Sequence, residues 1–379
     1  MSQNQSHDSN QKRLCLVEPF FTGSHRRWAE ELARRSRHDI RILSLPGRHW
    51  KWRMHGGAIT LANAVLEQDE PFSAILASDM LDLPVFLSRI RERHSSIPAG
   101  IYFHENQLAY PWSPRDGDKK RGLDLHYSFL NYTSALVANA AFFNSDFHRK
   151  RFLSDLPDFL KRYPDNQNLD TIQEIQSKSQ TLWLGMDLAG FDQHRPSGQI
   201  SKRERPLVLW NHRWEYDKNP IGFFRILYRL IDDGFDFDLA LAGDRFEEEP
   251  PYFQEAKERL GSRIIQYGRL SSFADYAKLL WNSDIALVTS IQDFFGGSVV
   301  ESIYCGCHPI LPRRLAYTDH LCPDDHPEAF YDEEEEAIDL IKQLLASGNW
   351  RKPFKEGYTM SRYDWSNQIE TYDHLLARM

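Results

Sequence analysis

The feature that most constrains this chain is an alternation of short apolar runs with amphipathic stretches of helical length, which occurs twice. In the first half the apolar runs are LCLV (14–17), DIRILSL (39–45), SAILAS (73–78), AGIYFH (99–104), AAFFNS (140–145) and a closing TLWLG (181–185). In the second half they are LVLWN (207–211), FDLALAG (237–243), RIIQYGR (263–269), DIALVTS (284–290) and HPILP (308–312). Strands that alternate with helices form parallel sheets covered on both faces. We therefore predict an α/β fold of two doubly wound, Rossmann-like domains that face each other across a cleft.

Polar and proline-bearing segments separate the two halves. A chain of 379 residues is longer than one compact core usually serves, so two domains are expected. We predict a disordered lead-in over 1–12, an N-terminal domain over 13–190, a linker over 191–206, a C-terminal domain over 207–350 and a helical segment over 351–379. For the last segment, packing back on the N-terminal domain is one option.

Composition favours a cytoplasmic protein. No apolar run reaches the roughly 20 residues of a membrane span, and the polar start lacks the apolar stretch of a signal peptide. The four cysteines show no paired metal-binding spacing, so we expect reduced thiols. Residues 1–200 hold 25 Lys and Arg against 23 Asp and Glu, a net of +2, and residues 201–379 hold 21 against 31, a net of −10. The total of −8 argues against non-specific nucleic-acid binding, although the first half keeps a local basic field.

Polar and glycine-bearing loops follow four of the predicted strands. In a doubly wound sheet, ligands bind at the carboxyl ends of the strands, so these loops should carry the chemistry. The first-half loops are EPFFTGSH, with Gly23, Ser24 and His25, and HENQ, with His104, Glu105, Asn106 and Gln107. The second-half loops are NHRWEYDKNP, with Arg213 and Lys218, and DFFGGSVVE, with Asp293, Gly296, Gly297 and Glu301.

The cations and glycines of the second-half loops suit a diphosphate. Arg213 and Lys218 precede a predicted helix start, where backbone N–H groups and the positive end of the helix dipole favour negative charge. Gly296 and Gly297 precede another helix start, where absent side chains let a ligand approach the backbone. Solvated charges are the alternative for Arg213 and Lys218.

The carboxylates Asp293 and Glu301 flank the glycine loop. Glu301, about one turn inside the predicted helix, can accept both hydroxyls of a ribose, and Asp293 can accept hydroxyls of a sugar beyond the diphosphate. Either acid alone is explained as well by a helix cap or a surface position. Together with the glycines, they indicate a nucleotide-sugar site.

Other classes of site lack their signatures. No GxGxxG, GxxxxGK[ST], HExxH or nucleophile elbow occurs, which argues against dinucleotide, P-loop, zinc-protease and serine-hydrolase sites. Asp236 and Asp238 mimic a metal-binding DxD, but they enter a predicted strand at the end opposite the ligand edge and should be structural. We therefore predict no metal and no cofactor apart from a donor substrate.

Together these motifs resemble those of one glycosyltransferase family. DFFGGSVVE resembles the acid-x7-acid motif of retaining, family 4 glycosyltransferases with the GT-B fold. EPFFTGSH, YFHENQLAYP, NHRWEYDKNP and FFGGSVVESIYCGCHPILP together resemble the tRNA-queuosine α-mannosyltransferase family, from about Leu14 to the C-terminal region. The resemblance implies metal-independent transfer of mannose from GDP-mannose, with retention, to the cyclopentenediol of queuosine at the tRNA wobble position.

The resemblance also implies roles for the site residues. Arg213 and Lys218 would hold the diphosphate and Glu301 the ribose, while Asp293 would hold the mannose and His104 would face it from the other domain. The family usually has Glu at the first acid, so Asp293 is one methylene shorter. We count His104, Asp293 and Glu301 as catalytic candidates.

A basic and aromatic stretch of the first half is the candidate tRNA surface. Cations beside aromatic rings suit phosphates and splayed anticodon bases. The candidates are Arg26, Arg27, Arg48, Trp50, Lys51, Trp52 and Arg53. Tryptophans packed on the domain with the charges outward are an equal alternative. Glu105, Asn106 and Gln107 are candidates for acceptor contacts, and for Glu105 a loop-orienting hydrogen bond is equally open.

Two other functions stay open at this point. One is a family 4 glycosyltransferase with a small-molecule, glycan or lipid acceptor, which would turn over without RNA. The other is a non-catalytic RNA- or nucleotide-binding module built on a decayed transferase, and the nearly intact set of motifs argues against it.

Overall fold

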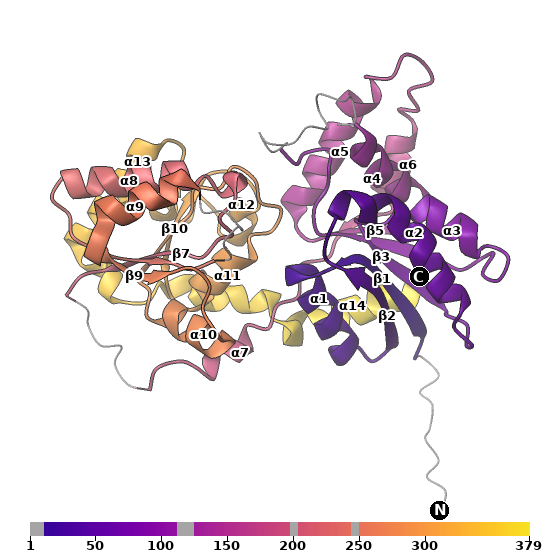
Figure 1. Ribbon diagram of the computed structural model, residues 1–379, viewed down its shortest axis with the longest axis horizontal. Coiled ribbons are helices and arrows are strands. Elements are labelled where there is room, and N and C mark those ends of the chain that lie inside the picture. The colour runs from indigo at the N-terminus through magenta and orange to yellow at the C-terminus, as the bar shows by residue number, and fades with distance from the viewer. Residues whose placement is uncertain (1–10, 112–124, 198–203, 244–249) are drawn as a thin grey trace, which may run out of the picture. The chain divides into compact units, whose positions relative to one another are not determined.

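The computed structural model describes residues 11–111, 125–197, 204–243 and 250–379 (Figure 1). The chain forms two compact units: unit 1 is Met1–Gly185 with Trp365–Met379, and unit 2 is Met186–Asp364. Most of the expected lead-in (1–12) and part of the expected linker (191–206) lie outside the described residues. Across the described ranges, no helix is both long and apolar enough to cross a bilayer.

Unit 1 is built on a parallel sheet, which has six strands among the described residues. In spatial order these are β2 (Asp39–Pro46), β1 (Arg13–Phe21), β3 (Ala74–Ser78), β4 (Ala99–Phe103), β5 (Ala140–Phe143) and β6 (Ser179–Thr181). The helices are α1 (Gly23–Arg35), α2 (Trp50–Leu66), α3 (Leu83–Ile90), α4 (His126–Val137), α5 (Asp146–Leu160), α6 (Thr171–Ser177) and α14 (Trp365–Arg378).

Alternation along the strands of unit 1 gives the sheet two apolar faces. Cys15 and Val17 of β1 face a core shared with α2 to α6, whereas Leu14 and Leu16 face a core shared with α1 and α14. Figure 1 shows these two groups of helices on opposite faces of the sheet. The continuous apolar strands are thus explained by burial on both sides, as in other doubly wound sheets.

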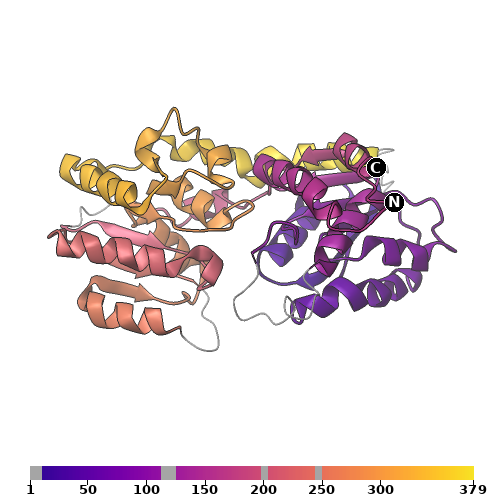
Figure 2. The same ribbon diagram turned by 90° about the horizontal axis from the view of Figure 1, so that it is seen from above.

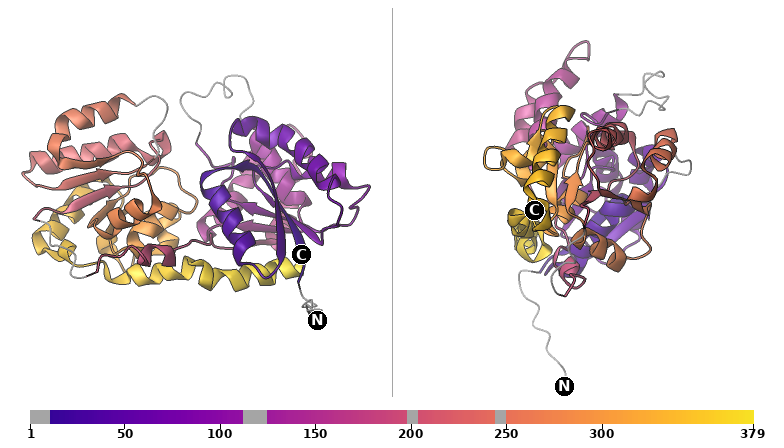
Figure 3. Two further views of the ribbon diagram at one scale, coloured as in Figure 1. Left: turned by 60° about the horizontal axis from the view of Figure 1, so that its bottom comes forward. Right: turned by 90° about the vertical axis from the view of Figure 1, so that its left-hand side faces the viewer.

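Helix α14 completes unit 1 although it comes last in the chain. Tyr372 accepts a hydrogen bond from Trp28 Nε1 at 3.1 Å and lies 2.9 Å from the carbonyl of Trp183 and 3.1 Å from the Tyr102 hydroxyl. Figures 1 and 3 show α14 beside α1, which agrees with the contacts between the two helices. The second apolar face is therefore closed by residues from both ends of the sequence.

Unit 2 repeats the architecture. Its described strands, in spatial order, are β12 (Phe330–Tyr331), β11 (His308–Pro312), β10 (Ile285–Leu287), β7 (Leu207–Trp210), β8 (Asp238–Leu241) and β9 (Ile264–Tyr267). The helices are α7 (Ala189–Asp192), α8 (Pro220–Asp232), α9 (Pro251–Leu260), α10 (Phe273–Trp281), α11 (Gly297–Tyr304), α12 (Tyr317–His320) and α13 (Glu334–Ser347). Short 3₁₀ turns are η2 (Tyr216–Lys218), η3 (Gly261–Arg263), η4 (Pro327–Ala329), η5 (Asn349–Arg351) and η6 (Lys355–Tyr363). Figures 1 and 2 show helices on both faces of the sheet.

The predicted α/β class is confirmed, since every pair of neighbouring strands within the described residues is parallel. One predicted strand is displaced: β6 ends at Thr181, where the prediction began. Leu182, just beyond it, is buried against α14 instead. The four cysteines are free thiols, as expected.

Candidate functional site

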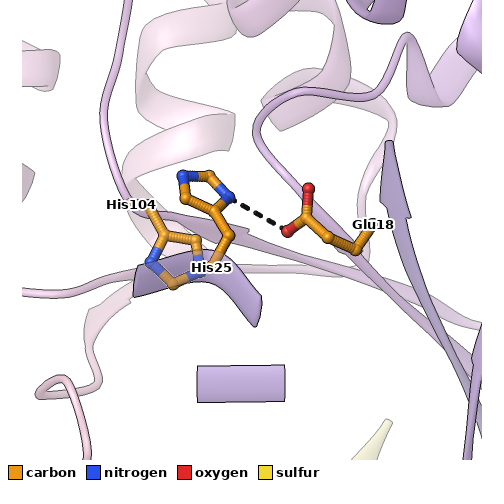
Figure 4. Close-up of side chains that lie close together, drawn as sticks. All are labelled: Glu18, His25 and His104. Atoms are coloured by element: carbon orange, nitrogen blue, oxygen red, sulfur yellow. Dashed lines mark hydrogen bonds and ion pairs between the residues drawn. The ribbon is translucent and has the colours of Figure 1, made fainter. Parts of the chain in front are cut away.

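In unit 1 the predicted loop residues His25 and His104 come together. β1 ends at Phe21 and α1 begins at Gly23, whose φ of +52° suits the tight turn between them. His25 lies in the first turn of α1 and His104 directly after β4. Their ring centroids are 4.2 Å apart (Figure 4). The carboxyl ends of β1 and β4, which β3 separates in the sheet, thus bring the two histidines together at one edge of the sheet.

His104 is held through both its backbone and its ring. Its N–H donates to Asp79 Oδ1 at 2.8 Å, and its carbonyl accepts from Asn144 Nδ2 at 2.8 Å. Its ring packs against Trp28 and Tyr102, with centroids at 4.7 and 4.8 Å. Its buried Nε2 has no hydrogen-bond partner among the described residues.

Glu18 and Asp79 were not predicted, and both lie at this site. Glu18 is fully buried on β1, where its Oε1 accepts the Phe20 N–H at 2.8 Å and its Oε2 lies 3.0 Å from His25 Nδ1 (Figure 4). Asp79 follows β3 and is almost fully buried. Donor atoms of Glu18, His25 and His104 lie within 4.8 Å of one another, a spacing that a metal ion could also use. The Glu18–His25 hydrogen bond accounts for two of these positions without an ion.

The charges in this cluster differ between the two histidines. Burial lowers the pKa of His25, but the charge and hydrogen bond of Glu18, with the charges of Asp79 and Glu105, outweigh it and raise the pKa to about 9. Burial, together with the charges of His25 and His148, holds the pKa of His104 well below its usual value. At neutral pH one ring is therefore charged and its neighbour is neutral.

The loop after His104 is ordered by its own polar groups. Asn106 is fully buried, and its Oδ1 accepts the N–H groups of Leu108 and Ala109. The Gln107 N–H donates to Asn131 Oδ1 at 2.8 Å, and the Gln107 side chain lies 3.4 Å from Glu105 Oε1. A loop-shaping role is thus visible for these residues, and acceptor contact stays a prediction.

In unit 2, Lys218 and Asp293 form an ion pair. Lys218 Nζ lies 3.1 Å from Asp293 Oδ2, 3.3 Å from Asp217 Oδ2 and 3.0 Å from the carbonyl of Gln292. The Tyr317 hydroxyl donates to the same Asp293 oxygen at 3.1 Å. Burial disfavours the charged form of each group, but the opposite charge of its partner favours that form more strongly. The pKa of Asp293 is therefore lowered and that of Lys218 is raised. Both groups are charged at neutral pH.

Arg213 is more exposed than that pair, although its charge still acts on the pKa of Lys218. Its side chain is 57% exposed and approaches Glu215 Oε2 at 3.3 Å. Of the two cations predicted to hold a diphosphate, one is therefore buried and fixed and the other is exposed. Asn219 caps α8, because its Oδ1 accepts the Gly222 N–H.

Glu301 belongs to a second network, on α11. Its Oε2 accepts a 2.6 Å hydrogen bond from the Tyr276 hydroxyl. Asn211 Nδ2 donates to the same hydroxyl at 3.0 Å and to the Ser298 carbonyl at 2.9 Å. Ser298 Oγ lies 3.0 Å from Nδ1 of His212, whose pKa is lowered to about 3 by burial and the charge of Lys218. Asn211, His212 and Tyr276 were missed because each is unremarkable by sequence alone.

The two glycines before Glu301 have different environments. Gly296 has a φ of +81°, and a Cβ there would lie 2.8 Å from the Tyr317 ring. A Cβ on Gly297 would meet only the Met186 methyl, at 3.5 Å. Helix α11 begins at Gly297. The backbone at the start of α11 is thus open in the way that binding of a phosphate requires.

The candidate tRNA residues are divided between packed and exposed positions. Trp50 packs at 5.1 Å from the Tyr127 ring, whereas Trp52 is 64% exposed. Lys51 lies over Trp50, and Arg53 Nε donates to the carbonyl of Pro46. Trp50 is thus packed on the domain, which was the alternative to a tRNA contact, whereas Trp52 remains largely exposed.

Asp236 and Asp238, which mimic a metal-binding DxD motif, form ion pairs with Arg205, which agrees with a structural role.

Comparison with known proteins shows which family the chain resembles. Residues 13–186 match a family described as tRNA-queuosine alpha-mannosyltransferase N-terminal. The chain is 32% identical over 310 residues to a Drosophila melanogaster tRNA-queuosine alpha-mannosyltransferase, covering 80% of each chain. It is 28% identical over 159 residues, 39% of this chain and 41% of that protein, to a GDP-mannose-dependent alpha-(1-6)-phosphatidylinositol dimannoside mannosyltransferase of Mycobacterium tuberculosis.

Solved structures show the fold. Sucrose-phosphate synthase from Thermosynechococcus elongatus superposes with a TM-score of 0.67 at 12% identity, covering 97% of this chain and 100% of that one. A glycosyltransferase from Rickettsia africae gives 0.67 at 15% identity, covering 97% and 98%. The predicted GT-B fold is thereby confirmed. With 80% of its length matched to a relative at 32% identity, the chain belongs to the tRNA-queuosine α-mannosyltransferase family.

Proposed function

We propose that this protein transfers mannose from GDP-mannose to the cyclopentenediol of queuosine at the wobble position of a tRNA anticodon, with retention of the anomeric configuration. The observation that carries the proposal is the pairing of family membership with the cluster around Lys218, Asp293 and Glu301 in unit 2. Similarity to a mannosyltransferase whose name specifies GDP-mannose supports the donor. The reaction takes place in the cytoplasm.

The donor groups have separate tasks. Glu301, fixed by Tyr276, accepts the ribose hydroxyls. Lys218, Arg213 and the N–H groups at Gly296 and Gly297 bind the diphosphate. Preorganised donors aimed at the charge that develops on a leaving group are typically the largest catalytic contribution, with a single donor worth about 10²- to 10³-fold in rate. Because these groups supply the positive charge, the proposal includes no metal ion.

Asp293 and His104 contact the mannose. Asp293 Oδ2 already accepts from Lys218 and Tyr317, so Oδ1 is the oxygen assigned to a sugar hydroxyl. A retaining transfer in which the leaving phosphate takes the acceptor proton needs positioning more than a dedicated base. Glu105 and Gln107 contact the acceptor, and Asn106 shapes their loop.

The tRNA contacts are assigned to unit 1. Trp52 stacks on a splayed base, and Arg48, Lys51 and Arg53 bind phosphates; Arg26 and Arg27 extend the basic surface. Replacing Arg48, Lys51 and Arg53 by alanine should weaken tRNA binding most at low salt, where phosphate contacts contribute most. It should also reduce the salt slope by up to about three, because each phosphate contact contributes about one.

The direct test is transfer of labelled mannose from GDP-mannose to tRNA that contains queuosine, with queuosine-free tRNA alongside and nucleoside mass analysis afterwards. A hexose gained on queuosine alone supports donor and acceptor together, and an undiminished rate in chelator supports the metal-free assignment. Binding of GDP-mannose without transfer to either tRNA would refute the acceptor and favour a glycan, lipid or small-molecule acceptor. Failure to bind GDP-mannose would refute the donor, and the Asp293 departure would be the first suspect.

A further inference from the structure

Glu18 has no task in the reaction proposed so far, yet its burial demands an explanation. An ionised carboxylate taken out of water is strongly destabilising unless it is hydrogen-bonded and paired. Glu18 is fully buried, and its two oxygens lie within hydrogen-bond distance of the Phe20 N–H and of His25 Nδ1. A carboxylate can only accept, so Nδ1 of His25 carries the proton. A charged His25 completes the compensation of the buried carboxylate.

His25 in turn packs against the ring that is assigned to the donor sugar. Its ring lies 4.2 Å from that of His104 at an angle of 37° (Figure 4). The Phe20 ring lies 6.2 Å from that of His25, nearly perpendicular to it. His25 is therefore a bridge: its Nδ1 is held by Glu18, and its ring forms one wall of the space that His104 occupies.

The titratable groups that face His25 come from three strands and the loops that follow them. They are Glu18 on β1, Asp79 after β3, and His104 and Glu105 after β4. Burial, opposed by the charge of His25 and helped by that of Glu105, raises the pKa of Asp79 to about 8. Of these carboxylates, Glu18 forms a hydrogen bond with His25. A cation in the first turn of a helix needs such a partner, because the helix dipole disfavours positive charge there.

We propose that Glu18 is a positioning residue for the transfer reaction: it holds the His25 ring through Nδ1, and that ring fixes His104 in one orientation. The proposal rests on the proposed function, because it requires His104 to contact the donor sugar. A charged His25 at 4.2 Å disfavours a second positive charge on His104. The neutral ring can then donate from one nitrogen and accept at the other.

Glu18→Gln tests the proposal. The amide keeps the shape of the side chain and an oxygen that accepts from His25. It removes the charge, and its NH2 group replaces the oxygen that accepts the Phe20 N–H, so that one hydrogen bond is lost as well. We expect kcat to fall about 10- to 100-fold, as for a small misplacement of a reacting group, with a smaller change in the KM for GDP-mannose. In the native protein, activity should be retained until His25 loses its proton near pH 9. In the variant the loss should begin at lower pH, and lowering the pH should restore part of the rate.

Two further variants control for folding. His38→Gln changes another buried histidine of unit 1, which is bonded to the Asp373 carbonyl and the Lys12 N–H and has no contact with His25. It should leave kcat and the pH profile unchanged, whatever its effect on thermal unfolding. Glu18→Gln/His25→Gln removes both members of the pair and should show the reduced kcat without the restoration at low pH. If Glu18→Gln does not fold, the double variant is measured in its place.

Two outcomes would overturn the proposal. One is a kcat and pH profile of Glu18→Gln that match the native protein. The other is a stoichiometric divalent ion that resists dialysis against chelator in the native protein and is absent from Glu18→Gln, because a His25 that binds a metal is neutral. The rate of GDP release from GDP-mannose in the absence of tRNA measures the reaction of the donor alone. Glu18→Gln is expected to slow this GDP release. If it does so, but the native protein transfers no mannose to tRNA, the acceptor assignment is refuted and this proposal stands.

Discussion

Replacing Lys218 by methionine tests the ion pair at the centre of unit 2. Methionine keeps most of the apolar stem and removes the ammonium group, so Asp293 and Asp217 lose a cation at 3.1 and 3.3 Å. Breaking a buried pair from one side costs about 3–5 kcal/mol, because the remaining charge stays buried without compensation. Lys342→Met is the matched control, since Lys342 pairs with Asp233 at 2.7 Å but both side chains are about one third exposed. An exposed pair contributes about 1 kcal/mol or less.

The pH dependence of the Lys218→Met effect follows from the two pKa shifts. The pKa of Asp293 is lowered by folding, so its share of the stability is present above the unfolded value of 3.8 and is lost as the pH falls through the folded pKa. The pKa of Lys218 is raised, so its share is complete below 10.5 and is lost as the pH rises through the folded pKa. In the variant, Asp293 stays buried without its main cation, so its pKa is higher than in the native protein. The difference in free energy of unfolding between native protein and variant should therefore be level near neutral pH and should begin to shrink above pH 3.8 as the pH falls.

The assay is urea unfolding followed by tryptophan fluorescence, in which the buried Trp210 and Trp214 report on unit 2. Lys218→Met/Asp293→Asn should recover part of the lost stability, since it neutralises one of the stranded carboxylates, but it should not recover transfer. If Lys218→Met costs no more than Lys342→Met, or costs the same in acid as at neutral pH, the reasoning from a desolvated pair is refuted.

Three other changes test separate parts of the site. Gly296→Ala should destabilise the protein by about 1–3 kcal/mol, because it forces a side chain into φ +81° against Tyr317, whereas Gly297→Ala should have a smaller effect; thermal unfolding compares them. Glu301→Gln should weaken GDP binding by about tenfold or more in calorimetry, because hydrogen bonds to a charged group are worth about 1.5–3 kcal/mol; equal binding would remove the ribose assignment. Trp52→Ala should weaken binding of anticodon-loop RNA by about 1–3 kcal/mol in fluorescence titration if a base stacks there, with GDP-mannose binding as the internal control.

The sequence predicted the two sheets well because apolar runs in a doubly wound fold mark burial on both faces. It misplaced β6 because hydrophobicity reports burial and not pairing: the strand Ser179–Thr181 is polar and lies at the sheet edge, whereas the apolar Leu182 after it packs on α14. β12, with only Phe330 and Tyr331, is too short for any periodicity.

The site was predicted in part for a related reason. Loops with glycines and charges stand out in a sequence, so His104, Lys218, Asp293 and Glu301 were selected as candidates. Glu18 is the first residue of the loop EPFFTGSH that was expected after the strand 14–17, but no role was predicted for it; β1 in fact continues to Phe21 and buries it. Its role depends on His25, which reaches it only through the turn after β1. Tyr276 lies on a helix surface, and its partner Glu301 is on another helix. Such pairings exist only once the elements have packed.

The position of α14 has a consequence for how the protein is made. The core that α1 and α14 share requires Tyr372 and Trp365, yet all of unit 2 is encoded between those residues and the rest of unit 1. At about 5–20 residues per second, a ribosome needs roughly 10–40 s to synthesise unit 2. During that interval the nascent first unit presents an uncovered apolar surface. Unit 2 can thus finish folding before the unit that precedes it, and the nascent chain has a window in which chaperone binding would be useful.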